Sequence, residues 1–444
     1  MGKKTTSSRR DFMKATSSLG FVAAMPTIVP SSVVSAEVAP SDTFVVGNIG
    51  LGWRGMDLVN GAMRNKNLEI AAIADLDMPF LLNALKILDD HYVVEREWIE
   101  GRGSQMKRPA LTKKAVDAYN DYRYLLERKD LDAVMIAVPD HWHAKTYIDA
   151  MNAGKDVYGE KPLSLTINQG RAIVRAARTN NRIFQTGSQQ RSAKEFRTAC
   201  EYVRNGRLGK IRHVHIGVGG APQRQGVPDE PVPPGLNWEM WLGQTPVVPY
   251  NPLRCHVEFR WFFEYSGGMV TDWGAHHCDI CQWGLGMDGS GPRFVEGTAE
   301  TSPGFYNTFT SFDFKYTYAN GITASMQNKN SGVTFYGEKG EIYVNRGKIS
   351  SNPEDILKEP LTSNDIRLYK SEDHIQNWVD CMKSRELPIT DVEIGHRSIT
   401  MCHIANICGH LKRKLEWDAE NEMFVNDPEA NGLLDRPQRA PYAI

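Results

Sequence analysis

The chain has 444 residues, of which 41% are hydrophobic and 24% are charged, and its formal net charge is −1. This length predicts two domains, and the composition is that of an ordinary folded protein. The balanced charge argues against nucleic acid or an anionic membrane surface as a partner. After the N-terminal region, no apolar stretch is long enough to predict a membrane span.

Residues 1–36 have the layout of an export signal. A basic segment at 8–14 (SRRDFMK) precedes a mildly apolar stretch, and small residues that suit cleavage after Ala36 follow. The paired Arg9 and Arg10 are typical of a twin-arginine signal, and the alternative is a disordered basic tail with a chance pair. We therefore expect the twin-arginine export machinery to carry the folded protein into the periplasm. Folding in the reducing cytoplasm would leave the seven scattered cysteines unpaired.

A first domain is predicted over residues 43–163. Its strands are expected at 43–49, 68–74, 117–120 and 133–138. A glycine-rich loop and a helix follow the first strand, and the polar, basic insertion at 91–112 is expected to be a loop. Strands that alternate with helices indicate an α/β domain with a doubly wound parallel sheet of the Rossmann type.

The pattern changes in a second domain, predicted over residues 164–418. Helices are expected at 167–179, 193–205, 373–383 and 394–411, and strands at 183–186, 211–218, 294–301, 309–318, 323–328 and 341–345. The proline-rich stretch at 221–236 is expected to be a loop. This order predicts an α/β domain with an open, mostly antiparallel sheet that packs one face on helices. Residues 419–444 are expected to form a C-terminal tail.

The glycine-rich loop predicts a dinucleotide site, because it follows a strand and opens a helix. Gly50 permits the tight turn, Gly52 lets a pyrophosphate approach the backbone, and Gly55 lets helix and strand pack closely. The intervening residues, expected at the same site, are Leu51, Trp53 and Arg54. Asp75, at the end of the second strand, suits the adenosine ribose and would repel a 2′-phosphate, which favours NAD over NADP. The alternative is glycines in an ordinary turn.

Several motifs follow the glycine loop. They read VPDHWH at 138–143, GEKP at 159–162, GSQQR at 187–191 and GGMVTDWGAHHCD at 267–279. Asp272, His276 and Asp279 recur at i, i+4 and i+7, which predicts one face of a helix. The whole series, with WEMWLG at 238–243 and GHRS at 395–398, resembles the Gfo/Idh/MocA family of sugar oxidoreductases from residue 43 to 418.

The resemblance implies a catalytic Lys161 near the reacting hydroxyl and the nicotinamide, with Asp272 and His276 as the catalytic aspartate and histidine. A histidine can take the hydroxyl proton, and an ammonium can stabilise a developing alkoxide. Further residues expected at the cofactor are Pro139, His143, Glu160, Lys161 and Gln189. Those expected at the substrate are Arg191, Arg260, Trp261, Tyr265, Asp272 and His276. The alternatives are a solvated lysine, a satisfied core histidine and ordinary aromatic packing. The family also implies a dimer or tetramer.

A zinc site is the competing interpretation of His277 and the Cys278–Cys281 pair, whose spacing can bind this metal. No second pair of ligands follows at a suitable distance, and neighbouring helical residues project about 100° apart. We expect no metal.

The export signal and the nucleotide loop together predict an enzyme with tightly bound NAD, because free NAD is a cytoplasmic metabolite. One form is an oxidoreductase that takes hydride from a sugar or glycoside hydroxyl, with C3 as a candidate, and returns it to a keto-sugar. The alternative is a glycosidase that uses transient oxidation, elimination, hydration and re-reduction. A third is a silent sugar sensor, against which the intact Lys161, Asp272 and His276 argue.

Overall fold

The computed structural model describes residues 42–92, 96–99, 103–106 and 116–444. The signal peptide predicted at 1–36 and much of the predicted insertion at 91–112 lie outside these residues. Residues 44–444 form a single compact unit. Among the described helices, none has both the length and the apolar character needed to cross a membrane.

The first sheet has the doubly wound order expected from the sequence. Its strands are β1 (Phe44–Ile49), β2 (Leu68–Ala74), β5 (Asp117–Tyr119), β6 (Ala133–Ile136), β7 (Asp156–Gly159) and β8 (Phe184–Thr186). They pair in parallel in the order β5-β2-β1-β6-β7-β8. Continuous apolar runs in β1, β2 and β6 suit this arrangement, because helices cover both faces of a parallel sheet.

Helices connect these strands and cover the sheet. They are α3 (Trp53–Arg64), α4 (Met78–Tyr92), α5 (Tyr122–Leu126), α6 (Asp140–Asn152) and α7 (Ile167–Thr179). Asp121 and Thr166 start α5 and α7, since each side chain accepts a hydrogen bond from the backbone of its first turn. The helix order therefore follows the expected alternation.

Strand β7 was not predicted from the sequence, and two further features of the first sheet differ from the expectations. Part of the segment expected to be a loop at 91–112 forms a hairpin, β3 (Arg96–Ile99) and β4 (Gly103–Met106), which adds antiparallel strands beside β5. The strand at β8, placed in the second domain by the boundary after residue 163, is the edge strand of the first sheet. Its three buried residues are too few to reveal their sheet from sequence alone.

The second sheet is mostly antiparallel, as expected. In the described chain its order is β15-β14-β13-β9-β12-β11-β10-β16-β17, and only the β9–β12 pair is parallel. The strands are β9 (Ile211–Gly217), β10 (Phe294–Glu300), β11 (Ser311–Thr317), β12 (Thr323–Gln327), β13 (Gly332–Gly337), β14 (Glu341–Asn345), β15 (Lys348–Asn352), β16 (Leu415–Asp418) and β17 (Met423–Phe424). Strands β13, β15, β16 and β17 were not predicted from the sequence, because they are short or lack a long apolar run.

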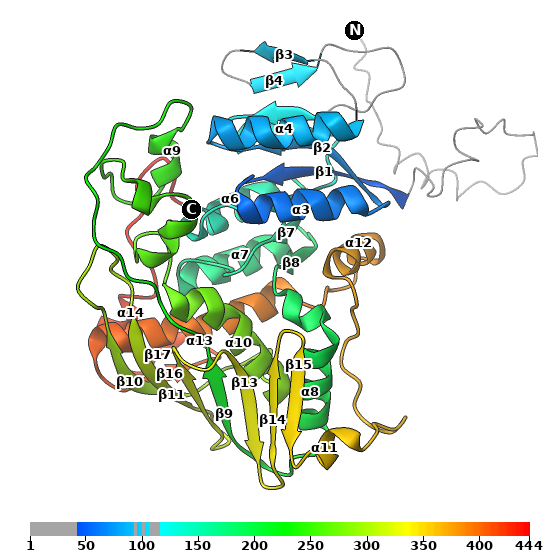
Figure 1. Cartoon of the computed structure of the whole chain (residues 1–444), viewed down its shortest axis with the longest axis vertical. Coiled ribbons are helices and arrows are strands. Elements are labelled where there is room, and N and C mark those ends of the chain that lie inside the picture. The colour runs from blue at the N-terminus through cyan, green and yellow to red at the C-terminus, as the bar shows by residue number, and fades with distance from the viewer. Residues whose placement is uncertain (1–41, 93–95, 100–102, 107–115) are drawn as a thin grey trace, which may run out of the picture. The chain divides into compact units, whose positions relative to one another are not determined.

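Helices α10 (Met269–Leu285) and α13 (Val392–Leu411) pack together and lie between the first domain and the second sheet (Figure 1). The remaining helices are α8 (Lys194–Arg204), α9 (Trp238–Leu242), α11 (Asp355–Lys358), α12 (His374–Ser384) and α14 (Pro428–Asn431). Single turns of 3-10 helix lie at Gln189–Ser192, Pro252–Arg254 and His256–Trp261. Most of α10 is buried, so its position is set by packing on both sides.

The contacts that join the second part of the chain to the first include one on α12 and one on the C-terminal tail. Helix α12 lies against α3, where Asn65 donates a hydrogen bond to Gln376 at 2.9 Å. The C-terminal tail returns to the first domain, where the ring of Tyr442 lies 5.5 Å from that of Trp142. The predicted tail at 419–444 therefore contributes packing, a strand and a short helix.

Candidate active site

A cavity of about 1050 Å³ lies beyond the carboxyl ends of β1, β2 and β6, where α10 meets the first domain. This is the edge at which open α/β sheets bind ligands. The glycine loop borders one end of the cavity, called here the cofactor end. Lys161, Asp272 and His276 border the other, called here the reaction end.

The glycines of the loop have different physical roles. Gly50 has a φ of +84°, and a Cβ there would lie 2.5 Å from the carbonyl oxygen of Ala137. A Cβ on Gly55 would lie 1.9 Å from the carbonyl oxygen of Gly50. A Cβ on Gly52 would meet only Phe80, at 3.9 Å, so this glycine faces open space in the cavity.

The loop and its helix fit the pyrophosphate of NAD. Helix α3 begins after Gly52 without a side-chain cap and without an acidic residue in its first turn. Its first backbone N–H groups and the positive end of its dipole are thus available to an anion. The open space at Gly52 is where the phosphates would approach.

Asp75 lines the cavity at the end of β2. Its carboxylate accepts hydrogen bonds from the backbone N–H of Leu51 at 2.5 Å and of Asp77 at 2.8 Å. Burial raises the pKa of Asp75 to about 6, against the opposing effect of these donors. Asp75 therefore stabilises the glycine loop and keeps oxygen lone pairs that suit ribose hydroxyls.

At the reaction end, Lys161 and Asp272 form an ion pair across the domain junction. Lys161 Nζ lies 2.6 Å from Asp272 Oδ1 and 3.1 Å from the Asp272 carbonyl oxygen. Arg260 Nε lies 3.5 Å from the same carboxylate oxygen. Burial alone would raise the pKa of Asp272, but the charges of Lys161 and Arg260 lower it below its ordinary value. The carboxylate is therefore ionised and holds the ammonium in place.

His276 lies one helical turn after Asp272 on α10. Its Nε2 is 3.2 Å from a guanidinium nitrogen of Arg346, while its buried Nδ1 has no partner among the described residues. Burial, and then the charges of Lys161 and Arg346, lower the pKa of His276 well below its ordinary value of 6.5. The ring is therefore neutral and able to accept a proton.

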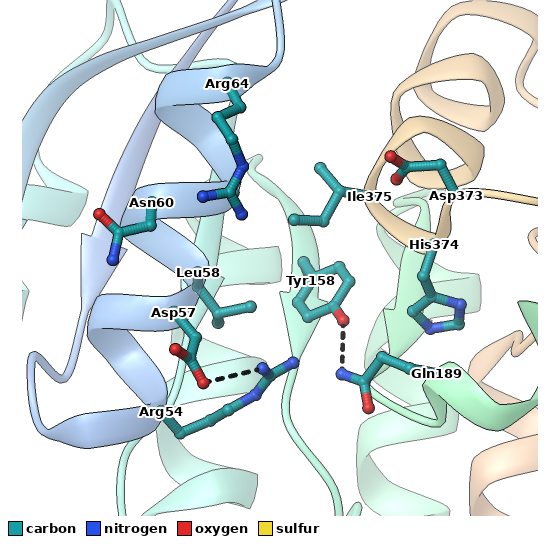
Figure 2. A pocket seen from close by; sticks show the side chains of 11 residues that line it. Arg54, Asp57, Leu58, Asn60, Arg64, Tyr158, Gln189, Asp373, His374 and Ile375 are labelled. Atoms are coloured by element: carbon teal, nitrogen blue, oxygen red, sulfur yellow. Dashed lines mark hydrogen bonds and ion pairs between the residues drawn. The ribbon is translucent and has the colours of Figure 1, made fainter. Parts of the chain in front are cut away.

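A second cavity of about 460 Å³ is lined mainly by α3 and the start of α12 (Figure 2). Arg54, Asp57 and Gln189 line both cavities. Arg54 Nε lies 2.8 Å from Glu160 Oε1, and the Gln189 amide donates to the same oxygen at 3.1 Å and to the Tyr158 hydroxyl at 2.9 Å. These bonds hold Glu160 and Gln189 at the cavity wall.

Most residues predicted from the sequence line the large cavity. They are Gly50, Leu51, Gly52, Trp53, Arg54, Asp75, Pro139, His143, Glu160, Lys161, Gln189, Arg260, Trp261, Asp272 and His276. Gly55 lies behind the loop and serves its packing. His143 is buried, with Nδ1 2.6 Å from the carbonyl oxygen of Pro162 and Nε2 2.9 Å from that of Val138. His143 supports the cavity wall through these two contacts with the backbone.

Two predicted substrate residues lie outside the cavity. Arg191 is 1% exposed and pairs with Asp279 at 2.8 Å and Asp288 at 2.7 Å. Tyr265 is also 1% exposed and packs its ring 5.0 Å from that of Trp241. The structure corrects both assignments: Arg191 neutralises the buried Asp279 and the partly exposed Asp288, and Tyr265 belongs to the core. Asp279 shares this structural role, although it follows Asp272 and His276 on α10.

The cavity residues that were not predicted from the sequence include Asp140 and Arg346. Asp140 stands inside the VPDHWH motif, accepts a hydrogen bond from the Ser266 hydroxyl, and has its pKa raised by burial to about 7. Its place in this motif could have identified Asp140 from the sequence. Arg346 occupies a hairpin turn between β14 and β15 and belongs to no motif, so only the fold brings it to His276.

The alternative zinc ligands are directed elsewhere. His277 Nδ1 lies 2.6 Å from the Gly217 carbonyl oxygen, and Cys281 Sγ lies 3.8 Å from the Tyr318 hydroxyl. Across the described ranges, no group of three or more His, Cys, Asp or Glu side chains could hold a metal ion. All seven cysteines are buried and free.

Solved structures share this fold. The WlbA dehydrogenase from Bordetella pertussis, in complex with NADH and UDP-GlcNAcA, aligns with a TM-score of 0.60 and 16% identity over 85% of this chain and 99% of its own. The aldose-aldose oxidoreductase from Caulobacter crescentus aligns with a TM-score of 0.60 and 16% identity over 84% and 99% of the two chains.

Curated relatives match over shorter spans. An alpha-N-acetylgalactosaminidase from Shewanella oneidensis is 29% identical over 221 residues, which are 46% of this chain and 44% of the relative. A glycosyl hydrolase family 109 protein from Shewanella sp. (strain ANA-3) is 31% identical over 188 residues, 42% of this chain and 38% of the relative. The chain thus spans less than half the length of these relatives.

Two family models match the chain. The oxidoreductase family's NAD-binding Rossmann fold matches residues 44–188, and its C-terminal alpha/beta domain matches residues 221–444. These spans contain the glycine loop and the reaction end. The chain therefore belongs to the Gfo/Idh/MocA family of NAD-binding oxidoreductases.

Proposed function

We propose that this protein oxidises a hydroxyl of a sugar or glycoside, with C3 as the candidate position, and returns the hydride to a keto-sugar acceptor. The observation that carries the proposal is the convergence of Lys161, ionised Asp272 and neutral His276 in the cavity that the glycine loop borders. Sugar dehydrogenases among the structures of the same fold support a sugar as substrate.

The side chains divide the work of removing a hydroxyl proton. His276 accepts the proton, because its ring is neutral and borders the cavity. The Lys161 ammonium stabilises the developing alkoxide, and Asp272 orients that ammonium at 2.6 Å. NAD bound at the cofactor end would supply the acceptor for the hydride of the same carbon. The alcohol thereby loses a proton and a hydride and becomes a carbonyl.

Tight retention of NAD is part of the proposal, and a strap from the second domain supports it. The strap, residues 219–261, crosses the end of β2, where the N–H of Met78 bonds to the Gly235 carbonyl at 3.1 Å and that of Asn237 to the Leu76 carbonyl at 3.1 Å. His256, on the strap, lies 3.5 Å from Asp77. These contacts close the sheet edge beside Asp75 and slow the loss of a bound cofactor.

Export belongs to the same proposal. A twin-arginine route for the folded protein would load NAD in the cytoplasm, and a retained cofactor would then work in the periplasm. Seven free, buried cysteines are compatible with folding under reducing conditions. We also propose a dimer or tetramer in which the outer face of the second sheet is covered.

A second candidate is a glycosidase that uses transient oxidation, and the relatives named as glycosidases favour it. Oxidation at C3 acidifies the C2 proton, so that the aglycone can leave by elimination. Water then adds, and the carbonyl is reduced again by the stored hydride. Both candidates begin with the same proton and hydride removal.

The test starts with protein purified without added nucleotide, from residue 37 onward. Denaturation should release about one NAD per chain. Addition of a glycoside should then produce the absorbance of NADH, which persists until a keto-sugar is supplied. Release of aglycone without lasting NADH would replace the oxidoreductase by the glycosidase. Absence of bound nucleotide would contradict tight retention.

A further inference from the structure

Arg346 is the cation of the reaction end that has no carboxylate partner among the described residues. The other cations there, Lys161 and Arg260, pair with Asp272, and the neighbouring Arg54 of the cofactor end pairs with Glu160. The guanidinium of Arg346 has its polar contact with neutral His276. A guanidinium directed at a neutral ring leaves most of its five donors for another acceptor.

The surroundings of Arg346 favour an incoming anion. Burial, and then the neighbouring charge of Arg54, lower the pKa of Arg346 below its ordinary value of 12.5, against the opposing effect of the Asp272 carboxylate. The same clustering of positive charge lowers the pKa of His276. A negative group between these side chains would relieve the repulsion.

The hairpin turn presents Arg346 in a defined orientation. Residues 346–347 join β14 to β15, Gly347 adopts a φ of +67°, and its N–H bonds to the Glu195 carboxylate at 2.8 Å. The guanidinium carbon lies 4.7 Å from the ring centroid of Trp273, which is a cation–π contact. Stacking fixes the guanidinium plane and leaves its edge free for a carboxylate, which it can bind through two parallel hydrogen bonds.

Arg346 also occupies the atom of His276 that would accept a proton. Arginine can only donate, so Nε2 of His276 must be the acceptor and the neutral ring carries its proton on Nδ1. While this hydrogen bond persists, Nε2 is not available to a substrate hydroxyl. An anion that attracts Arg346 would free it.

We propose that the substrate carries a carboxylate, as in a hexuronic acid or its glycoside, and that Arg346 binds this group. Binding moves the guanidinium from His276 Nε2 to the carboxylate, so that the acidic substrate itself uncovers the base. Arg346 is thus a specificity-determining residue of the site. The inference rests on the proposed function, because it assigns the substrate class of the same reaction.

The experiment compares methyl β-D-glucuronide and methyl β-D-galacturonide with the corresponding neutral methyl glycosides, using the NAD-loaded protein. Both binding, by calorimetry, and NADH formation are measured. The variants are Arg346→Gln, which removes the charge, and Arg346→Lys, which keeps the charge but lacks the planar guanidinium group. Lys348→Gln is the matched control, since it removes a cation from the same hairpin that lies over Tyr343 instead of Trp273.

The native protein should prefer at least one uronide over its neutral counterpart by about 10- to 100-fold, the range of hydrogen bonds to charged groups. Arg346→Gln should reduce this preference to within about threefold, with unchanged NAD content, and Arg346→Lys should lie between. Lys348→Gln should keep it. If the native protein binds and oxidises acidic and neutral sugars equally well, the inference is wrong. Loss of NAD in Arg346→Gln would also overturn it, because Arg346 would then bind the cofactor.

Failure of the two proposals can be told apart. If uronides bind in an Arg346-dependent way but no sugar yields NADH, the proposed oxidation is wrong and the anion site stands. If neutral sugars yield NADH and uronides show no advantage, the oxidation stands and the anion site is wrong.

Discussion

The two ends of the large cavity are assembled differently. The cofactor end comes from one continuous stretch, β1, the glycine loop, α3 and β2, in which each residue has a local reason to be where it is. The reaction end joins Lys161 after β7, Asp272 and His276 on α10, and Arg346 on a distant hairpin. The first is a supersecondary motif, and the second exists only when the two domains meet.

The largest expected effect is at the reaction end. Lys161→Ala should lower turnover by about 10²- to 10⁴-fold, since the ammonium is lost from the alkoxide and Asp272 loses its main partner. The NAD content of the purified protein should not change. Both are measured on the same preparation.

Lys145→Ala is the control for this comparison. It removes a lysine that pairs with Asp149 at 2.8 Å on α6, away from the reaction end. It should leave turnover unchanged. Full activity in Lys161→Ala, or loss of NAD from it, would contradict the assignment of turnover and NAD binding to different ends of the cavity.

His276→Ala should lower turnover by about 10²-fold or more at constant NAD content. In the native protein, kcat/KM should decrease on the acid side only below pH 6.5, because burial and the charges of Lys161 and Arg346 lower the pKa of His276. We call this decrease the acid limb. Arg346→Gln should move this limb to higher pH. A limb that stays in place in this variant would show that Arg346 does not act on His276.

The contrast explains how far the sequence could be interpreted. The glycine spacing and the strand before it predicted the loop, and Asp75 follows because the next strand of such a unit ends beside it. Lys161, Asp272 and His276 came from a family resemblance carried by motifs. Their convergence, at 2.6 Å for Lys161 and Asp272, is a property of the assembled fold.

The errors have physical reasons as well. Arg191 was expected at the substrate because its motif resembles a segment of the family, but two carboxylates from elsewhere in the chain pair with it. Tyr265 could not be told from a sugar-stacking ring without its neighbours. Arg346 lies in a turn of ordinary composition, so its approach to His276 depends on the register of β14 and β15, which sequence patterns alone do not define.

The cofactor end offers a matched pair of glycine substitutions. Gly55→Ala should lower the free energy of unfolding by about 1–3 kcal/mol or more, because its Cβ would lie 1.9 Å from a backbone oxygen. Gly52→Ala should preserve stability, since its Cβ would meet nothing closer than 3.9 Å. It should weaken NAD binding by about tenfold through loss of a close backbone contact.

Denaturant unfolding and nucleotide titration of the two variants measure these effects. Equal NAD affinity in Gly52→Ala and the native protein would mean that the open space at this glycine is not where the pyrophosphate lies. An undisturbed Gly55→Ala would contradict the backbone packing.

The smallest expected effect concerns Asp140, which connects the first domain to the residues before α10 through the Ser266 hydroxyl. Burial raises the pKa of this carboxyl to about 7 in the folded protein, from an ordinary value of 3.8. The folded state therefore binds the extra proton between these values, and stability should fall as pH rises from about 4 through about 7. Asp140→Asn keeps an acceptor for Ser266 but cannot ionise, so it should flatten this fall and raise Tm at pH 8 by about 2–4 °C. Asp355→Asn, at a carboxylate that is 87% exposed, is the control and should leave the pH dependence unchanged. If the stability of Asp140→Asn follows the same pH profile as that of the native protein, the Asp140 carboxylate is ionised at neutral pH. The reaction end then carries one more negative charge.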